Sequence, residues 1–355
     1  MVESPLPLVS FLLALLGLLF GARADESAPA GAAPERAPSA WHLNADASGL
    51  FLGGHDVVAY HLDGEAKRGD AAHEVEHRGL RFRFTCEEHV AAFREDPAFF
   101  LPAWGGWCAL FIAIDPEATG QAPRRIPVDP TCFLVEDDRL LLFARGGGFD
   151  GRAQWLRGAD ECGAATARRE RGDAFWASRE ALAAEFPTLP EGMNPLAPME
   201  TAQLAALMGD WDAEYTFRRG RTSEARTTLR ATWSFRFSWD GFAVTDEWRQ
   251  IDGLPGNSGP ALRSFDPLGR VWTNHYVPIN APMGAAWHFV STFDETGMHG
   301  ELEQSDPDGT PFRTRIHFRD IRRDSFTWSC DRSYDGGESW IEDWGVGRQR
   351  RATER

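Results

Sequence analysis

The chain has 355 residues, of which 43% are hydrophobic, and a formal net charge of −16. This length suggests two domains of ordinary size, and the hydrophobic fraction is high enough to fill a core in each. The acidic excess argues against nucleic acid as a partner, because phosphate binding depends on Lys and Arg side chains. Five cysteines are too few for a disulfide scaffold, and their odd number leaves at least one unpaired within the chain.

The N-terminal segment, residues 1–24, has the layout of a secretory signal peptide. Leu6 to Phe20 are almost continuously apolar and Ala22-Arg23-Ala24 is a small-x-small cleavage motif, although the segment before them carries Glu3 and no basic residue. About 15 apolar residues fall short of the ~20 that a spanning helix needs, which favours cleavage over an uncleaved membrane anchor. We therefore expect a periplasmic or secreted protein, without a stable membrane span after cleavage, in a compartment where thiols can pair.

The rest of the chain divides into two globular blocks. Residues 25–40 are rich in Ala, Pro and Glu and predict a disordered leader. The first block covers residues 41–189 and the second covers residues 199–351. Between them, residues 190–198 contain three prolines without periodicity, which is typical of a linker.

Short strands and helices mix in the first block, which predicts an α+β domain. Val57–Tyr60 and Leu80–Phe84 are expected as strands. Thr85 precedes Glu88 by the spacing of a capping box, so a helix is expected to begin at the next residue and to end before Pro97.

The remainder of the first block predicts a hairpin and a long helix. Cys132–Val135 and Leu140–Phe143 flank a charged turn and are expected to pair as a hairpin. Residues 164–185 are expected to be helical, with Gly172-Asp173 as the point where the helix could be interrupted.

The second block shows the alternation of apolar and polar residues that marks strands with one buried face. It is strict over the eleven residues 229–239, and it recurs over residues 312–318 and 326–334. Turn signals such as Asp240-Gly241 and Asp308-Gly309 separate these runs. About ten strands of this kind, with no helical stretch between them, predict an all-β domain that is an up-and-down barrel or a sandwich.

Three segments of the first block match, in order and spacing over about 60 residues, the motifs of one known family. They are Gly54-His55-Asp56-Val57-Val58-Ala59-Tyr60, Phe84-Thr85-Cys86-Glu87-Glu88-His89 and Trp104-Gly105-Gly106-Trp107-Cys108-Ala109. On these residues the block resembles the YHS domain family, in the variant found in exported bacterial proteins. Metal-binding members of that family carry two cysteines in the strand-to-helix turn. This chain has Thr85 and His89 at those positions, so a metal role cannot simply be carried over.

The second block is similar to a lipocalin-like barrel family of unassigned function, common in bacteria. Gly209-Asp210-Trp211 fits the opening Gly-x-Trp of that family, and Ser333-Tyr334-Asp335-Gly336-Gly337-Glu338-Ser339-Trp340 fits its closing hairpin. The resemblance implies an antiparallel barrel of about ten strands.

Cys86 and His89 are three residues apart at an expected helix start, so their side chains should share one face. With Cys108 from a glycine-flanked turn and a fourth ligand such as His55, they form a candidate site for a zinc or copper ion. Two other interpretations stay open, namely a disulfide between the two cysteines and inert burial of both. A Cys–His nucleophile is also conceivable, but no third residue in the sequence is an obvious orienting group.

The other three cysteines are expected in the core, and they are Cys132, Cys162 and Cys330. Among the histidines of the second block, His275, His288, His299 and His317 show no ligand spacing. His317 falls on the outward phase among arginines and is expected to be solvated.

The inward phase of the barrel strands supplies the candidate ligand-binding residues. They are Trp233, Phe235, Trp328, Arg332, Trp340 and Glu342. A small barrel either holds one small ligand or is filled by its own side chains. The second possibility includes an ion pair between Arg332 and Glu342 that plugs one end.

The hypothesis from these residues is an exported two-domain binding protein. Its YHS-like domain would bind a metal ion or a partner, and its barrel would hold a small apolar molecule. Two alternatives remain, namely a hydrolase or isomerase with its site in the barrel, and a purely structural interaction protein.

Overall fold

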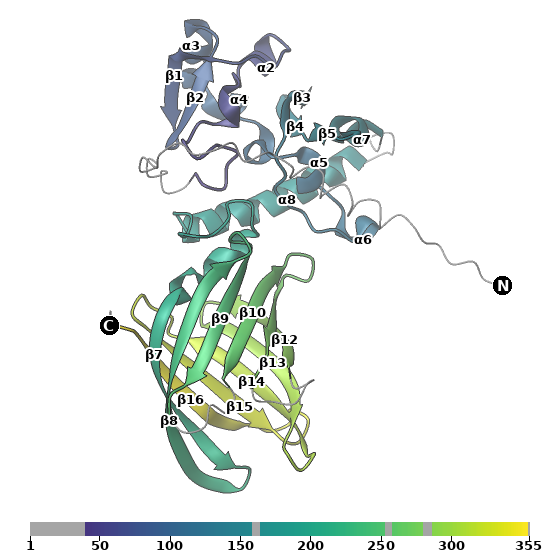
Figure 1. Ribbon diagram of the computed structural model, residues 1–355. Helices are drawn as coiled ribbons and strands as arrows, with labels where there is room; N and C mark the ends of the chain where they lie inside the picture. The colour runs from purple at the N-terminus through teal and green to yellow at the C-terminus, as the bar shows by residue number, and fades with distance from the viewer. Residues whose placement is uncertain (1–39, 158–163, 253–257, 280–285, 354–355) are drawn as a thin grey trace, which may run out of the picture. The chain divides into compact units, whose positions relative to one another are not determined.

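The computed structural model describes residues 40–157, 164–252, 258–279 and 286–353. The signal peptide predicted for residues 1–24, all but the last residue of the predicted leader, and Cys162 lie outside this part of the chain. The chain divides into two compact units, residues 1–188 and 189–355, which we describe separately (Figure 1). Within the described ranges, no helix combines the length and the apolar character that crossing a membrane requires.

The first unit mixes short helices with two-stranded antiparallel sheets, which confirms the α+β prediction. Its elements up to residue 119 are η1 (Leu52–Gly54), α2 (Ala59–Leu62), β1 (Asp70–His77), β2 (Leu80–Phe84), α3 (Glu87–Glu95), α4 (Pro97–Phe100), η2 (Ala103–Gly106), α5 (Ala109–Ile112) and α6 (Pro116–Thr119). The later elements are β3 (Asp129–Glu136), β4 (Arg139–Phe143), β5 (Arg145–Gly146), β6 (Phe149–Asp150), α7 (Gly151–Arg157) and α8 (Ala164–Glu185).

The prediction of a strand at Val57–Tyr60 is wrong, because this segment turns into helix α2. The carboxylate of Asp56 accepts hydrogen bonds from the backbone N–H groups of Val58 and Ala59, at 2.9 and 3.2 Å. These bonds hold the chain in a helical turn and override the β preference of the two valines.

The segment from β2 to α3 follows the predicted boundaries except that the helix begins one residue later than expected, and its cap differs. Strand β2 spans the predicted residues, and α3 begins at Glu87 and ends before Pro97. The N-cap residue is Cys86, whose side chain makes no capping hydrogen bond. The hydroxyl of Thr85, the expected cap, instead donates to Asp56 at 2.8 Å.

The predicted hairpin and long helix are both present, as β3–β4 and α8. Helix α8 runs without interruption over 22 residues. Gly172 is buried in it because the indole of Trp104 lies against its backbone, and a Cβ atom there would be 2.3 Å from the ring. The glycine therefore marks a close packing contact rather than a break in the helix.

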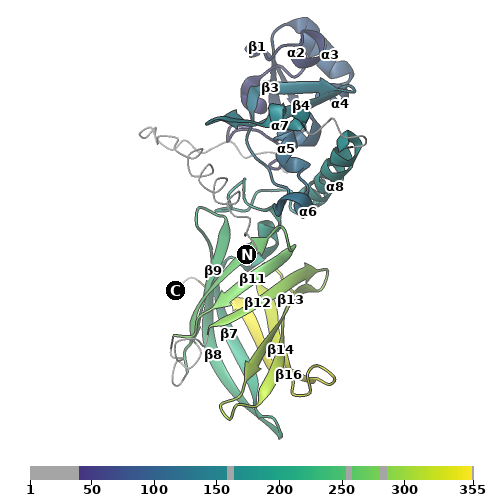
Figure 2. The same cartoon turned by 90° about the vertical axis from the view of Figure 1, so that its right-hand side faces the viewer.

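The second unit is a closed antiparallel barrel of ten strands, as the alternation predicted (Figures 1 and 2). Each strand pairs with its neighbour in sequence, and the last strand pairs with the first to close the cylinder. The strands are β7 (Gly209–Gly220), β8 (Ser223–Ser238), β9 (Ala243–Gln250), β10 (Gly259–Asp266), β11 (Val271–Tyr276), β12 (Trp287–Asp294), β13 (Gly297–Ser305), β14 (Pro311–Arg319), β15 (Ser325–Ser333) and β16 (Ile341–Arg351).

One end of the barrel is closed by η3 (Met199–Leu207), which precedes the first strand. Leu204 and Leu207 of this segment are fully buried in the barrel core. The indole N–H of Trp211 donates to the Leu207 carbonyl at 2.8 Å, which ties the segment to β7. Inward residues near this end are almost completely buried, and they are Trp211, Phe235, Trp272, Met298, Phe318 and Phe326.

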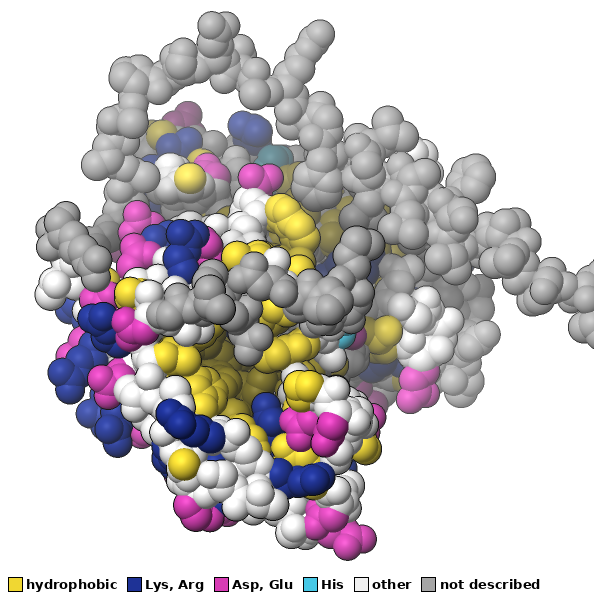
Figure 3. Space-filling view, turned by 60° about the horizontal axis from the view of Figure 1, so that its bottom comes forward, with side chains coloured by type: hydrophobic (Ala, Val, Ile, Leu, Met, Phe, Trp, Pro, Cys, Tyr) yellow, Lys and Arg dark blue, Asp and Glu magenta, His cyan; other side chains and the backbone are white. Residues whose placement is uncertain are grey.

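The other half of the barrel is less completely filled. Inward aromatic side chains there are only partly buried, and they are Phe217, Trp248, Trp287, Phe289, Trp328 and Tyr334. Figure 3 looks onto this end and shows a hollow with hydrophobic walls. Because interiors are normally packed to the density of organic crystals, partly exposed inward rings indicate space that the barrel leaves open.

Candidate functional site

A chain of buried polar side chains crosses the barrel interior on five consecutive strands. Asp246 on β9 accepts hydrogen bonds from the Trp233 indole and from Nε of Arg263, both at 2.6 Å. The Arg263 guanidinium also donates to Oδ1 of Asn274 at 2.7 Å, and the Asn274 amide donates to the Ser291 hydroxyl at 2.9 Å. Each member of this chain thus has a partner, as buried polar groups generally require.

The polar chain lies against the packed half of the barrel. The Arg263 guanidinium sits over the ring of Phe318, 5.2 Å from its centroid, and 6.0 Å from that of Phe235. Its charge is balanced by Asp246, since the two side chains form an ion pair that is about 95% buried. This layer is therefore electrically neutral.

Tyr215 on β7 lies in an aromatic cluster within the same interior. Its ring meets Trp248 and Trp328 edge to face, with centroids 5.6 and 5.7 Å apart. Its register partner is Gly347 on β16, where a Cβ atom would lie 2.2 Å from the tyrosine ring. The glycine leaves the room that this ring occupies.

Arg332 lies toward the far ends of the strands from η3, between two aromatic rings. Its guanidinium is 4.1 Å from the centroid of Phe312 and 4.4 Å from that of Trp344. It pairs with Asp306 at 3.4 Å, and Asp306 also accepts from the Tyr334 hydroxyl at 3.0 Å.

Four of the six candidate ligand residues point into the barrel. Trp233 and Phe235 are 5% and 0% exposed and pack against Phe318 and Phe326, so they fill the interior near the closed end. Trp328 is one of the partly buried inward aromatic residues, and the side chain of Arg332 is also partly buried.

The inward placement of Trp340 and Glu342 is wrong. Trp340 stacks on Arg315, an outward residue of β14, at 3.7 Å, and Glu342 is exposed. The cause is the phase of β16, because the inward Cys330 pairs with Gly345 and, beyond a register shift of two residues, the inward Arg332 pairs with Ile341. Odd-numbered residues of β16 therefore face inward on both sides of the shift and Glu342 falls on the outward phase. Arg332 pairs with Asp306 rather than with the glutamate.

In the first unit, Asp56 joins two of the segments that carry the family resemblance. Its side chain is completely buried and accepts hydrogen bonds from the start of α2 and from the segment between β2 and α3. One oxygen receives the amides that begin α2, and the other receives the Thr85 amide and hydroxyl, each at 2.8 Å, together with His89 Nδ1 at 2.7 Å. A carboxylate buried in this way depends on its donors, since an unpaired buried charge is very costly.

Three of the four candidate metal ligands are engaged in other contacts, and the fourth, Cys86, is a partly buried free thiol at the N-cap of α3. His89 directs Nδ1 to Asp56 and has Nε2 at 3.8 Å from Asp63. His55 has Nδ1 at 3.1 Å from the Leu52 carbonyl, and burial lowers its pKa. Cys108 is fully buried, and its sulfur accepts the Ala144 amide at 3.2 Å.

The chemistry of these side chains does not fit a metal site as they stand. Burial raises the pKa of the Cys108 thiol, which opposes the thiolate that a metal requires. Among the residues that the structure describes, no group of three or more His, Cys, Asp or Glu side chains is arranged to hold a metal ion. The metal site stays a prediction.

The four described cysteines are free, so the structure does not contain the Cys86–Cys108 disulfide. Cys132 and Cys330 are buried, as expected for core residues. The nucleophile alternative gains an orienting group, since Asp56 contacts His89, but both ring nitrogens of His89 face carboxylates.

The outer wall of the barrel carries two histidine pairs. His275 and His288 are register partners with 2.6 Å between their Nδ1 atoms, and His299 and His317 are partners with 2.8 Å between theirs. The expectation that His317 is solvated is wrong, because it is 8% exposed and its Nε2 lies 3.1 Å from Asp331.

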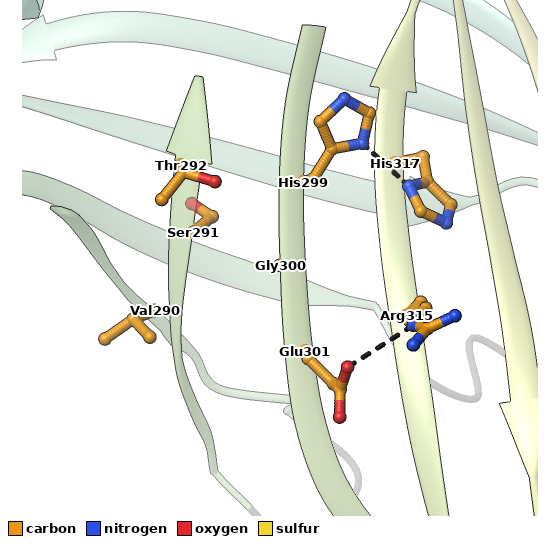
Figure 4. A pocket seen from close by; sticks show the side chains of 8 residues that line it. All are labelled: Val290, Ser291, Thr292, His299, Gly300, Glu301, Arg315 and His317. Atoms are coloured by element: carbon orange, nitrogen blue, oxygen red, sulfur yellow. Dashed lines mark hydrogen bonds and ion pairs between the residues drawn. The ribbon is translucent and has the colours of Figure 1, made fainter. Parts of the chain in front are cut away.

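An open pocket of about 430 Å³ lies beside the second pair, across strands β12 to β14 (Figure 4). Its lining residues are Val290, Ser291, Thr292, His299, Gly300, Glu301, Arg315 and His317. Both nitrogens of each histidine are already occupied, since Nε2 of His299 lies 2.6 Å from the Thr296 hydroxyl. Burial lowers the pKa of His299, which favours its neutral form. These groups hold one another and offer little to a ligand.

Sequence reasoning missed the histidine pairs and the interior polar groups. The second pair had a signal, because His299 and His317 each lie nine residues from Asp308 of the predicted turn. Asp246 and Arg263 gave no such signal, since each stands on a strand whose phase was not assigned. Gln349 was missed because placing Glu342 inward assigned β16 the opposite phase. Neither a scan against protein-family models nor a search of the curated proteins gave a match for this chain.

Proposed function

We propose that the chain is an exported two-domain binding protein whose barrel holds a small, largely apolar molecule. The observation that carries the proposal is the hollow at the barrel end opposite η3, whose inward aromatic side chains remain partly exposed (Figure 3). A concave apolar site with a few polar groups is the usual form of a small-molecule site. On this proposal the first unit is a YHS-like domain that binds a protein partner or a metal ion.

The binding proposal accounts for the interior better than the alternatives do. A hydrolase or isomerase needs an acid or base presented to its substrate, whereas Asp246 and Arg263 are turned to each other. A purely structural barrel needs no hollow, and its interior would be packed throughout.

Titration of the full chain with the apolar fluorescent probe N-phenyl-1-naphthylamine tests the proposal. We expect saturable binding of one probe per chain, weakened about tenfold by Trp328→Leu, since a lost aromatic contact of about 1.4 kcal/mol gives that factor. Trp340→Leu is the matched control, because Trp340 stacks on Arg315 of the outward face and should leave binding unchanged. Absence of saturable binding, or equal weakening by both variants, would overturn the proposal.

The role of the first unit has its own test. Metal analysis of anaerobically prepared protein beside a Cys108→Ser variant would support the metal hypothesis if stoichiometric zinc or copper were present only in the unsubstituted chain. Absence of metal from both would reject it.

A further inference from the structure

The interior next to Tyr215 collects hydrogen-bond donors that lack acceptors. Gln349 on β16 is 1% exposed, and its Oε1 accepts the backbone N–H of Trp328 at 3.1 Å. That bond fixes the orientation of the amide, because only the oxygen can accept from an N–H group. The Nε2 atom of Gln349 is buried without a partner.

Tyr215 is 2% exposed, and its hydroxyl also has no hydrogen-bond partner of ordinary length. Burial raises its pKa strongly, while the side chains of Gln349 and Trp248 act in the opposite direction. Both of these neighbours present N–H groups, so neither can accept the hydroxyl proton. Two buried donors are thus left unsatisfied, a condition that costs enough to need a cause.

The donors pack directly against the backbone of β16, where glycines leave room for their side chains. A Cβ atom at Gly347 would be 2.2 Å from the Tyr215 ring and 2.6 Å from Gln349 Nε2. The neighbouring inward residue of β16 is also a glycine, Gly345, where a Cβ atom would lie 2.6 Å from the ring of Phe217. These two glycines therefore allow the rings of Tyr215 and Phe217 and the Gln349 amide to pack side by side against β16.

The charges of the described interior are already paired. Arg263 is matched by Asp246, and Arg332 is matched by Asp306. An anionic ligand would lose its hydration without gaining an uncompensated cation, which is unfavourable. A neutral oxygen acceptor meets the unsatisfied donors without that cost.

We propose that the barrel ligand is a neutral apolar molecule with an acceptor oxygen, such as a ketone or ester carbonyl, bound by the Tyr215 hydroxyl and the Gln349 amide. This inference rests on the proposed function. The aromatic rings of Trp248 and Trp328 hold the apolar body, and the two donors select molecules that carry the oxygen. An ordered water is the competing occupant, because it too can accept from both groups.

The experiment compares three related fluorescent probes on the full chain. They are the neutral ketone prodan, dimethylaminonaphthalene without the ketone, and the carboxylate dimethylaminonaphthoate. We expect prodan to bind at least tenfold more tightly than either of the others, as satisfying buried donors predicts.

Two substitutions assign the preference to residues. Tyr215→Phe and Gln349→Leu should each remove most of the preference for prodan and leave the affinity for the ketone-free probe unchanged. Tyr60→Phe is the control, because that hydroxyl lies in the first unit, where it donates to the Pro130 carbonyl at 2.9 Å, and its loss should not affect the preference.

Each result has one interpretation. Equal binding of prodan and the ketone-free probe, a preference that survives both substitutions, or tighter binding of the carboxylate would overturn the inference and leave the binding function standing. Failure of all three probes to bind would overturn the proposed function together with the inference.

Discussion

Replacing Asp246 by Ala should be among the most damaging single changes to the barrel. Asp246 is 3% exposed, and its removal takes the acceptor away from the Arg263 guanidinium and the Trp233 indole, which are each 5% exposed. Breaking a buried ion pair from one side typically costs about 3–5 kcal/mol, because the remaining charge is uncompensated. We expect a loss of free energy of unfolding of about that size for Asp246→Ala.

The same reasoning predicts that removing both charges is much less costly. Apolar side chains of similar volume often replace a buried ion pair at little cost, so Asp246→Leu with Arg263→Met should lose no more than about 2 kcal/mol. The matched control is Asp210→Ala. Its pair with Arg236 has a similar distance of 2.7 Å but is more than half exposed, and exposed pairs contribute about 0–1 kcal/mol.

Urea unfolding of the full chain, followed by tryptophan fluorescence, measures these differences. Nine of the 14 tryptophans lie between residues 199 and 351, so the signal reports mainly on the barrel. The reasoning is refuted if Asp246→Ala costs no more than Asp210→Ala, or if the double variant is as unstable as the single one.

Three further predictions concern the first unit and the thiols. Asp56→Ala should speed hydrogen exchange of the amides that donate to it by the equivalent of about 1–3 kcal/mol, and unchanged exchange would contradict its role as a shared acceptor. Gly172→Ala should destabilise the chain by about 1–3 kcal/mol in thermal unfolding through its clash with Trp104, although helix propensity alone predicts a gain of about 1 kcal/mol. Burial raises the pKa of Cys330 to about 12. In native protein near pH 8 iodoacetamide should therefore modify Cys86 and spare Cys330, which peptide mass spectrometry can check.

The barrel was predictable because its signal is local. Each of the runs over residues 229–239, 312–318 and 326–334 alternates in hydrophobicity within a single strand, and strands β8, β14 and β15 contain most of these residues. The predicted end of the first strand was wrong, since Trp239 lies beyond β8 in a turn and is 68% exposed. The fold class followed from the number of runs and from the absence of helical periodicity between them.

The candidate site was less predictable because it depends on relations between strands. The inward phase of β16 was predicted wrongly, since Gly345 and Ile341, not Glu342, lie opposite the inward residues of β15, and only the pairing of the two strands reveals that phase. The Tyr215–Gln349 constellation needs the pairing of the first and last strands, which lie more than a hundred residues apart in the chain. In the first unit, the side chain of Asp56 outweighed the β preference of its neighbours.

The pairing of β16 with β7 also governs when the barrel can form. Trp211 of β7 pairs with Arg351 of β16, so the barrel cannot close until the last strand is present to pair with the first. During synthesis the nine earlier strands would emerge as an open sheet with two unpaired edges, which is a template for association with other chains. Productive folding of this unit is therefore expected to follow completion of the strand, and a ribosome that stalls before residue 341 should release an aggregation-prone fragment.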